Sequence, residues 1–180
     1  MYRWEFGKNG LVSEAFVQPD KLIDGVDALA ALNPRLMLDI SAFKNAKSAD
    51  AVGAISLAAF EEVSLPAVSD KQLATVAPAL KGVRKLRLMC RGFADANFTP
   101  VGLRAVADQV KGLKGLSIDF YRSVNEGTGR AKAELPALTE YVDLIVSHPG
   151  FAELQSIHIP GAKPKAFASL KKLSKVKTSW

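Results

Sequence analysis

Residues 73–88 read LATVAPALKGVRKLRL, and residues 103–118 read LRAVADQVKGLKGLSI. Aligned at an offset of 30, the two segments match at nine positions, and each match is an identity or an exchange between aliphatic residues. A match of this length indicates an internal repeat, and such a repeat determines the architecture of the chain that contains it.

Two hydrophobic periods follow one another within this unit. Leu73, Val76 and Leu80 are spaced like one stripe of a helix, whereas Leu86 and Leu88 are two residues apart, as on one face of a strand. The unit therefore predicts a helix followed by a short strand.

The ends of the two predicted helices carry matching signals. Ser69 is a typical capping residue before the first helix, and Pro100 is favoured in the first turn of the second. Gly82 and Gly112 come just after the predicted helix ends, where glycine adopts a left-handed conformation at little cost. Both units are thus expected to contain a helix, a tight turn and a strand.

The second half of the unit reduces to the template apolar-x-x-apolar-x-x-apolar-x-apolar, which fits the chain seven times. Of the 28 template positions 25 are apolar, whereas the composition of 48% alone would supply about half. The second positions lie 23, 25, 23, 30, 41 and 19 residues apart, so the array is irregular. The seven sets are Asn9/Val12/Ala15/Val17, Leu32/Arg35/Leu38/Ile40, Leu57/Phe60/Val63/Leu65, Leu80/Val83/Leu86/Leu88, Val110/Leu113/Leu116/Ile118, Phe151/Leu154/Ile157/Ile159 and Leu170/Leu173/Val176/Thr178.

A helix and a strand of this size bury their apolar faces only when successive units stack on one another. A doubly wound sheet also alternates helices and strands, but the short strands and the constant helix-to-strand register favour stacked units. We therefore expect an α/β fold, namely a right-handed α/β solenoid with short parallel strands on one face and helices on the other.

These segments resemble leucine-rich repeats of the long, helix-containing kind found in ribonuclease inhibitor-like proteins. VRKLRLMC at 83–90 and LKGLSIDF at 113–120 look like the strand segment L-x-x-L-x-L of that family, and residues 99–116 look like its helical half. The opening residues 10–40 resemble the leading segment of bacterial repeat proteins. The family usually has Asn or Cys three residues after the last strand leucine, and this chain does not. The resemblance implies a horseshoe-like fold and a packing motif without chemistry of its own.

The domain prediction is a single leucine-rich-repeat-like domain over 1–180, with a hairpin cap at 1–18 and irregular βα repeats at 19–180. The cap is expected because Trp4 and Phe6 alternate with charged residues before a turn signal at Asn9-Gly10. We expect these aromatic side chains to cover the first core layer. At the other end, Trp180 is either a minimal cap or the point from which a natural continuation is missing.

Composition excludes several classes of protein. Cys90 is the single cysteine and His148 and His158 are the two histidines, so a disulfide framework and a cysteine- or histidine-rich metal site are not expected. Neither a signal peptide nor an apolar segment long enough for a membrane span is present. We expect a cytoplasmic protein without a cofactor and without membrane association. The residues leave the partner and the oligomeric state open.

The residues between and just after the strand leucines are expected to point away from the core. The resemblance implies that this concave face is the usual surface for binding a partner, here most simply another protein. The alternative is that the same residues form only the solvated side of a sheet. The predicted partner-binding residues are Phe16, Met37, Asp39, Glu62, Lys85, Arg87, Ser117, Asp119 and His158.

Ser117 and His158 take the same template position on neighbouring predicted strands, with Asp119 nearby. This grouping invites comparison with a Ser-His-Asp triad. The sequence has no nucleophile elbow and no signal for an oxyanion hole, and an open sheet face does not exclude water. We therefore expect a non-catalytic protein. His148 precedes Pro149-Gly150 and is expected to end a helix, where partial positive charge suits the helix dipole.

Charge is divided unevenly along the chain. Residues 1–80 carry 7 basic and 10 acidic side chains, a balance of −3, and residues 81–180 carry 17 and 8, a balance of +9, which together give +6. Lys and Arg cluster without an intervening acid at 81–91 and again at 163–177. These clusters support a nucleic-acid-binding module as the alternative function. The insertion at 121–136 is glycine-rich but lacks the spacing of a phosphate-binding loop, and we expect a surface loop there.

Overall fold

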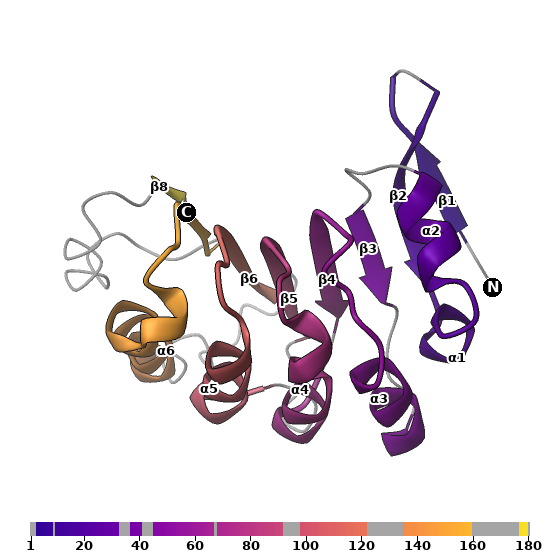
Figure 1. The fold of residues 1–180 in the computed structure, drawn as a ribbon. Coiled ribbons are helices and arrows are strands. Elements are labelled where there is room, and N and C mark those ends of the chain that lie inside the picture. The colour runs from indigo at the N-terminus through magenta and orange to yellow at the C-terminus, as the bar shows by residue number, and fades with distance from the viewer. Residues whose placement is uncertain are drawn as a thin grey trace, which may run out of the picture.

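The computed structural model describes residues 3–8, 10–32, 37–40, 45–66, 68–91, 98–121, 135–159 and 177–179. These residues form one eight-stranded sheet in which the order of the strands in space is their order in the chain (Figure 1). The strands are β1 (Arg3–Phe6), β2 (Val12–Val17), β3 (Met37–Ile40), β4 (Glu62–Pro66), β5 (Lys85–Arg91), β6 (Gly115–Tyr121), β7 (Ser156–His158) and β8 (Lys177–Ser179).

Helical segments precede strands β3 to β7, and helices α3 to α6 lie along one side of the sheet (Figure 1). Neighbouring helices from α3 to α6 contact one another in chain order. The predicted α/β class is therefore confirmed. The helical segments are α1 (Pro19–Leu22), α2 (Val26–Leu32), α3 (Ala46–Gly53), α4 (Asp70–Val76), η1 (Ala77–Leu80), α5 (Pro100–Gln109), α6 (Leu135–Ser147) and η3 (Pro149–Phe151), where η denotes a 3₁₀ helix.

The predicted unit ends are also confirmed. Ser69 caps α4 in a capping box with Gln72, and the Thr99 side chain accepts a hydrogen bond from the backbone N–H of Val101 at the start of α5. Gly82 and Gly112 have φ of +88° and +81°, in the left-handed region that glycine tolerates best. Both turns lead directly into a strand, so the turn residues set where β5 and β6 begin.

The core lies between the sheet and the helices and is made largely of template residues. In the four units from Leu57 to Ile159, every template side chain is at most 5% exposed. Leu32 is an exception among the predicted core residues, because it is the last residue of α2 and is 51% exposed. Only Leu29 of that helix is buried, so the second unit departs from the template.

The N-terminal hairpin forms as predicted, but its aromatic side chains do not cover the first core layer as expected. β1 and β2 pair antiparallel, and Gly10 in the connecting turn has φ of +74°. Trp4 pairs with Ala15 and is 37% exposed, whereas Phe6 is 67% exposed. The register of β1 shifts between Glu5 and Phe6, and such an irregularity redirects the side chains that follow it. The prediction that Phe6 covers the first core layer is therefore wrong.

The helix layer is tied together at the start of α5 by a carboxylate from the preceding unit. Asp70, the first residue of α4, accepts hydrogen bonds from the Thr99 backbone N–H at 2.6 Å, the Thr99 hydroxyl at 2.7 Å and the Gly102 backbone N–H at 3.0 Å. Two of these donors are backbone groups at a helix start, which would otherwise lack an intrahelical partner. Asp70 therefore fixes α5 against α4.

Candidate partner-binding face

The face of the sheet opposite the helices carries most of the predicted binding residues, and we call it the outer face. Leu86 and Leu88 of β5 are buried in the core, while Lys85 is exposed and Arg87 is half-exposed. This alternation is that of a strand with one face packed and the other open. The outer face therefore consists of the residues that alternate with the core positions.

Strand register brings the outer-face residues into straight rows that cross the sheet. All nine predicted binding residues fall in three such rows, although the structure describes only the backbone of Met37 and Asp39. The first row is Phe16, Asp39, Ser64, Arg87, Ser117, His158 and Ser179. The second row is Glu14, Met37, Glu62, Lys85, Gly115, Ser156 and Lys177. The third row includes Pro66, Met89 and Asp119.

The template predicts this register correctly from β2 to β7 and wrongly at β8. It aligns Val176 with Ile157, whereas the structure pairs Ile157 with Thr178. A shift of two residues leaves each side chain on the same face of a strand, so the alternating pattern alone does not distinguish the two registers. Leu170, Leu173 and Val176 of the seventh template set lie outside the described residues.

Arg87 is held on the outer face by Asp119 of the neighbouring strand. Its Nε and Nη2 donate to Asp119 Oδ2 at 2.7 and 2.5 Å, and the Ser117 hydroxyl lies 3.5 Å from Asp119 Oδ1. The Arg87 side chain is 41% exposed and that of Asp119 is 16% exposed. A pair as exposed as this contributes little to stability, but two N–H groups on one carboxylate fix the orientation of the guanidinium.

Two further ion pairs join successive units near the points where strands begin. Lys85 Nζ bonds Glu61 Oε1 at 2.6 Å, and Lys114 Nζ bonds Glu153 Oε2. Lys85 therefore pairs with the residue before β4 rather than with Glu62, its partner in the strand register. Sequence spacing did not predict either pairing, because each joins residues from different units.

Ser64 departs from the expectation that outer-face residues are exposed. It belongs to the first row, yet it is 1% exposed, and its hydroxyl has no hydrogen-bond partner among the described residues. Its chain neighbours Val63 and Leu65 are both fully buried in the core on the opposite face. Ser64 is thus the one buried polar residue found among the described stretches, and its burial could not be read from the template.

The structure brings Ser117 opposite His158, as predicted, but with bonding unlike that of a triad. The Ser117 hydroxyl lies 3.5 Å from Asp119 Oδ1, and Asp119 Oδ2 accepts hydrogen bonds from Arg87. In a triad the serine donates to the histidine, and the carboxylate orients that histidine. The contacts of Ser117 and Asp119 therefore differ from those of a triad.

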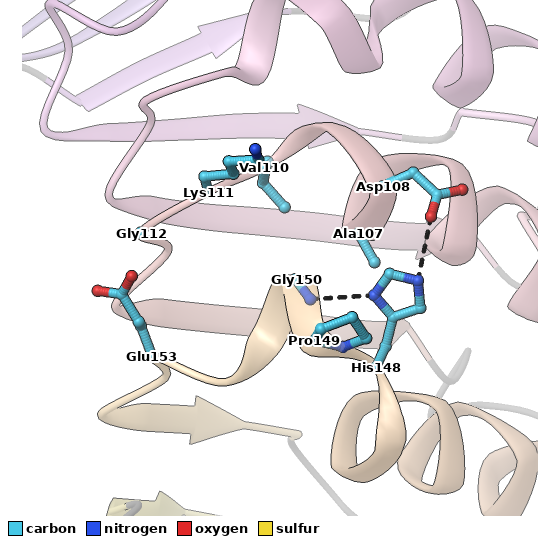
Figure 2. Close-up of a pocket in the computed structure, with 9 residues that line it drawn as sticks. All are labelled: Ala107, Asp108, Val110, Lys111, Gly112, His148, Pro149, Gly150 and Glu153. Carbon is cyan, nitrogen blue, oxygen red and sulfur yellow. Dashed lines mark hydrogen bonds and ion pairs between the residues drawn. The ribbon is translucent and has the colours of Figure 1, made fainter.

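A separate pocket of about 370 Å³ opens on the helix side of the molecule, where η3 packs against α5 (Figure 2). Gly150 is required at this contact, because a Cβ added to it would lie 1.9 Å from the carbonyl oxygen of Ala107. No pattern in the sequence indicates this pocket. Its lining residues are Ala107, Asp108, Val110, Lys111, Gly112, His148, Pro149, Gly150 and Glu153.

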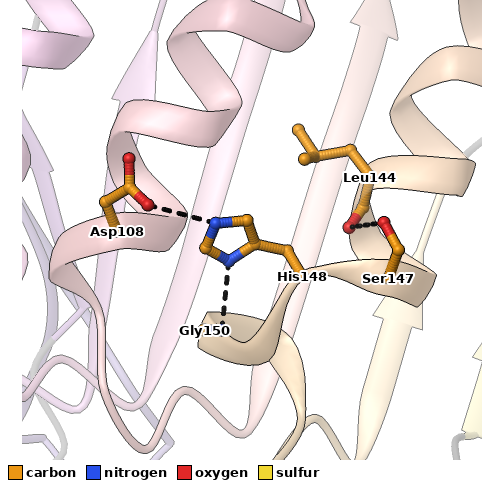
Figure 3. Close-up of polar contacts among 5 residues, drawn as sticks. All are labelled: Asp108, Leu144, Ser147, His148 and Gly150. Atoms are coloured by element: carbon orange, nitrogen blue, oxygen red, sulfur yellow. Dashed lines mark hydrogen bonds and ion pairs between the residues drawn. The ribbon is translucent and has the colours of Figure 1, made fainter.

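His148 follows the end of α6, as predicted, and is one of the lining residues of this pocket. Figure 3 shows its polar contacts. Its Nδ1 accepts a hydrogen bond from the Gly150 backbone N–H at 3.1 Å, so Nε2 carries the proton in the neutral ring and donates to Asp108 Oδ1 at 3.1 Å. The side chain is 12% exposed. Both ring nitrogens are already bonded within the protein, so this histidine links α5 to η3 and has no lone pair available to a substrate.

The described residues contain no group of three or more His, Cys, Asp or Glu side chains arranged to hold a metal ion. No helix within those stretches combines the length and apolar character needed to cross a membrane. Residues 163–176 of the second basic cluster and 122–134 of the insertion lie outside the described part of the chain.

Comparison of the chain with models of protein families, with curated proteins and with solved structures found no match.

Proposed function

We propose that the chain is a right-handed solenoid of degenerate leucine-rich repeats of the helix-containing, ribonuclease inhibitor-like type. Support comes from the strand order, which follows the chain from β1 to β8 without a reversal. A doubly wound sheet reverses its strand order at a switch point and places helices on both faces. Sequential order with helices α3 to α6 on one side is instead the arrangement of stacked units.

We further propose that the protein is a non-catalytic scaffold that binds a protein partner through the outer face. The observation that supports this is the first row, in which register aligns Phe16, Arg87 and His158 from strands distant in sequence. Aromatic and arginine side chains dominate the binding energy at protein interfaces. The Asp119 contacts hold Arg87 in one orientation, which lowers the entropy lost when a partner binds it.

The bonding of Ser117 and the position of His148 support the non-catalytic assignment. Ser117 is directed to Asp119 rather than to a general base, and His148 uses both ring nitrogens within the protein. Nucleophilic catalysis needs a nucleophile that donates to a base. The described contacts of Ser117 and His148 are not of that kind.

The test is affinity capture from the source organism with two matched triple variants. Phe16→Ala, Arg87→Ala and His158→Ala together change the outer face. Val101→Ala, Arg104→Ala and Gln109→Ala together change exposed positions of α5 in the helix layer. Proteins captured by the wild type should be lost with the outer-face variant and retained with the α5 variant, with circular dichroism confirming that both fold. Equal capture by the two variants would contradict the outer-face assignment.

The alternative is that the basic part of the chain binds nucleic acid, and one contact favours it. The backbone N–H of Lys114 donates to the carbonyl of Arg84 at 2.7 Å, which places the two residues side by side just before adjacent strands, where the Lys114 side chain also pairs with Glu153. Lys81 and Lys111 take equivalent positions in the preceding turns, and both are exposed. Polynucleotide binding that weakens steeply with salt would support this function, and absence of binding at low salt would exclude it.

A further inference from the structure

The buried hydroxyl of Ser64 is the most unusual polar group in the described part of the outer face. Four other side chains near the centre of that face each have a polar partner: Lys85, Arg87, Ser117 and Asp119. Leaving a buried hydroxyl unpaired costs free energy, and native proteins pair most such groups. Alanine would fit the same space without that cost. The Ser64 hydroxyl therefore needs a hydrogen-bond acceptor that the described residues do not supply.

Arg87 stands next to Ser64 in the strand register. Neighbouring strands lie about 4.8 Å apart, so a single acceptor atom above the sheet can bond both side chains once the atoms that bury Ser64 move aside. A guanidinium has five N–H donors, and the contacts to Asp119 use only Nε and Nη2. Arg87 therefore keeps further donors while Asp119 holds it in place.

The charges around this position indicate which acceptor fits. Asp119 already neutralises Arg87, and Glu61 already neutralises Lys85. An incoming phosphate or carboxylate would meet the Asp119 carboxylate beside Arg87, and like charges at such distances repel. An uncharged carbonyl oxygen gains the same hydrogen bonds without that repulsion.

We propose that Ser64 and Arg87 form a subsite for a backbone carbonyl of an extended, uncharged peptide segment of the partner. Such a segment presents a carbonyl at every residue. Met89, the half-exposed next outer-face residue of β5, offers an adaptable apolar contact for a flanking side chain. The neighbouring outer-face side chain of Glu62 is half-exposed, and a side chain of that kind changes rotamer quickly enough to admit an arriving group. This subsite rests on the proposed function.

A phage-displayed library of random linear peptides, selected on the full chain, tests the subsite without knowledge of the natural partner. Peptides that bind the wild type should bind Ser64→Ala about tenfold more weakly, the loss expected for one hydrogen bond. Ser156→Ala, an exposed serine of the second row, should leave their affinity unchanged. Because the proposed contacts carry no net charge, affinity should change less than about twofold between about 0.1 M and about 1 M salt.

A second measurement guards against a merely structural role for Ser64. Ser64→Ala should unfold at a higher denaturant concentration than the wild type while it binds the selected peptides more weakly. The subsite is overturned if no peptide is enriched, if enriched peptides bind Ser64→Ala as well as the wild type, or if they are acidic and lose affinity steeply with salt. If Ser64→Ala keeps full binding while the triple variant of Phe16, Arg87 and His158 loses it, the subsite fails and the proposed function stands.

Discussion

The middle of the sheet and the N-terminal hairpin follow similar patterns in sequence but differ in how well they bury their apolar residues. From β4 to β6 every described apolar template residue is buried. Large apolar side chains that the structure exposes concentrate instead in the first units: Trp4, Phe6, Leu11, Ile23 and Leu32, with Val101 as the exception farther along. Among the described apolar template residues of the first two units, Ala15, Val17 and Ile40 are buried, Val12 is half-buried and Leu32 is exposed. The repeat pattern thus predicts burial fully where a unit has neighbours on both sides and less completely in the first units of the array.

The largest difference between the two regions is expected for phenylalanine. Phe60, just before β4, is 1% exposed, whereas Phe6 in β1 is 67% exposed. Phe60→Ala should lower the free energy of unfolding by about 3–5 kcal/mol, and Phe6→Ala should change it by less than about 0.5 kcal/mol. Chemical denaturation of both variants measures this. Similar losses would mean that the hairpin is packed as tightly as the middle of the sheet.

A smaller difference is expected for the first-turn aspartates of α4 and α2. Asp70 accepts three hydrogen bonds from Thr99 and Gly102, whereas Asp27 is exposed in the first turn of α2. Asp70→Ala should lower the free energy of unfolding by about 1–3 kcal/mol because it leaves helix-start donors without their partner, and Asp27→Ala should lower it by at most about 0.5 kcal/mol. Equal effects would show that the Asp70 contacts do not hold α5 in place.

Ser64 is the position where the well-packed middle region is expected to gain stability from a substitution. Ser64→Ala should raise the free energy of unfolding by about 1 kcal/mol, because it removes a buried hydroxyl without a partner. The exposed control Ser156→Ala should leave it unchanged within about 0.5 kcal/mol. A loss of stability in Ser64→Ala would indicate that the hydroxyl is bonded in the native protein.

The smallest effect is expected for the ion pair on the outer face. A double-mutant cycle of Arg87→Ala and Asp119→Ala should give a coupling free energy of about 0.2–1 kcal/mol, because the Arg87 side chain is 41% exposed and water screens the pair. Coupling above about 2 kcal/mol, a value usual only for desolvated pairs, would mean that the outer face is drier than its exposure indicates. The measurement is urea unfolding of the two single variants and the double variant.

Much of the fold was predictable because it depends on local chemistry and on periodicity. Ser69, Gly82 and Gly112 act within a few residues of their own position, so their roles follow from sequence alone. The template placed the strands from β2 to β7 in the correct register because their core faces are apolar and a slip of one residue would expose them. At β8 the same rule failed, since a shift of two residues keeps each side chain on its face.

The candidate site was predictable in its positions and not in its contacts. Alternation along each strand identified Arg87, Ser117 and Asp119 as outer-face residues, and register aligned them with their neighbours. The pairing of Arg87 with Asp119 and the burial of Ser64 depend on side chains from different units. No spacing within one unit carries that information.

The sequence by itself determined the alternation of helix and strand, the residues that face the core and the separation of a −3 half from a +9 half. These properties depend on which residue types follow one another along the chain. Only the tertiary structure decided that Phe6 and Leu32 are exposed, that Ser64 is buried and that His148 bridges α5 and η3. Those outcomes depend on which unit packs beside which, because burial and hydrogen bonding are properties of neighbours in space.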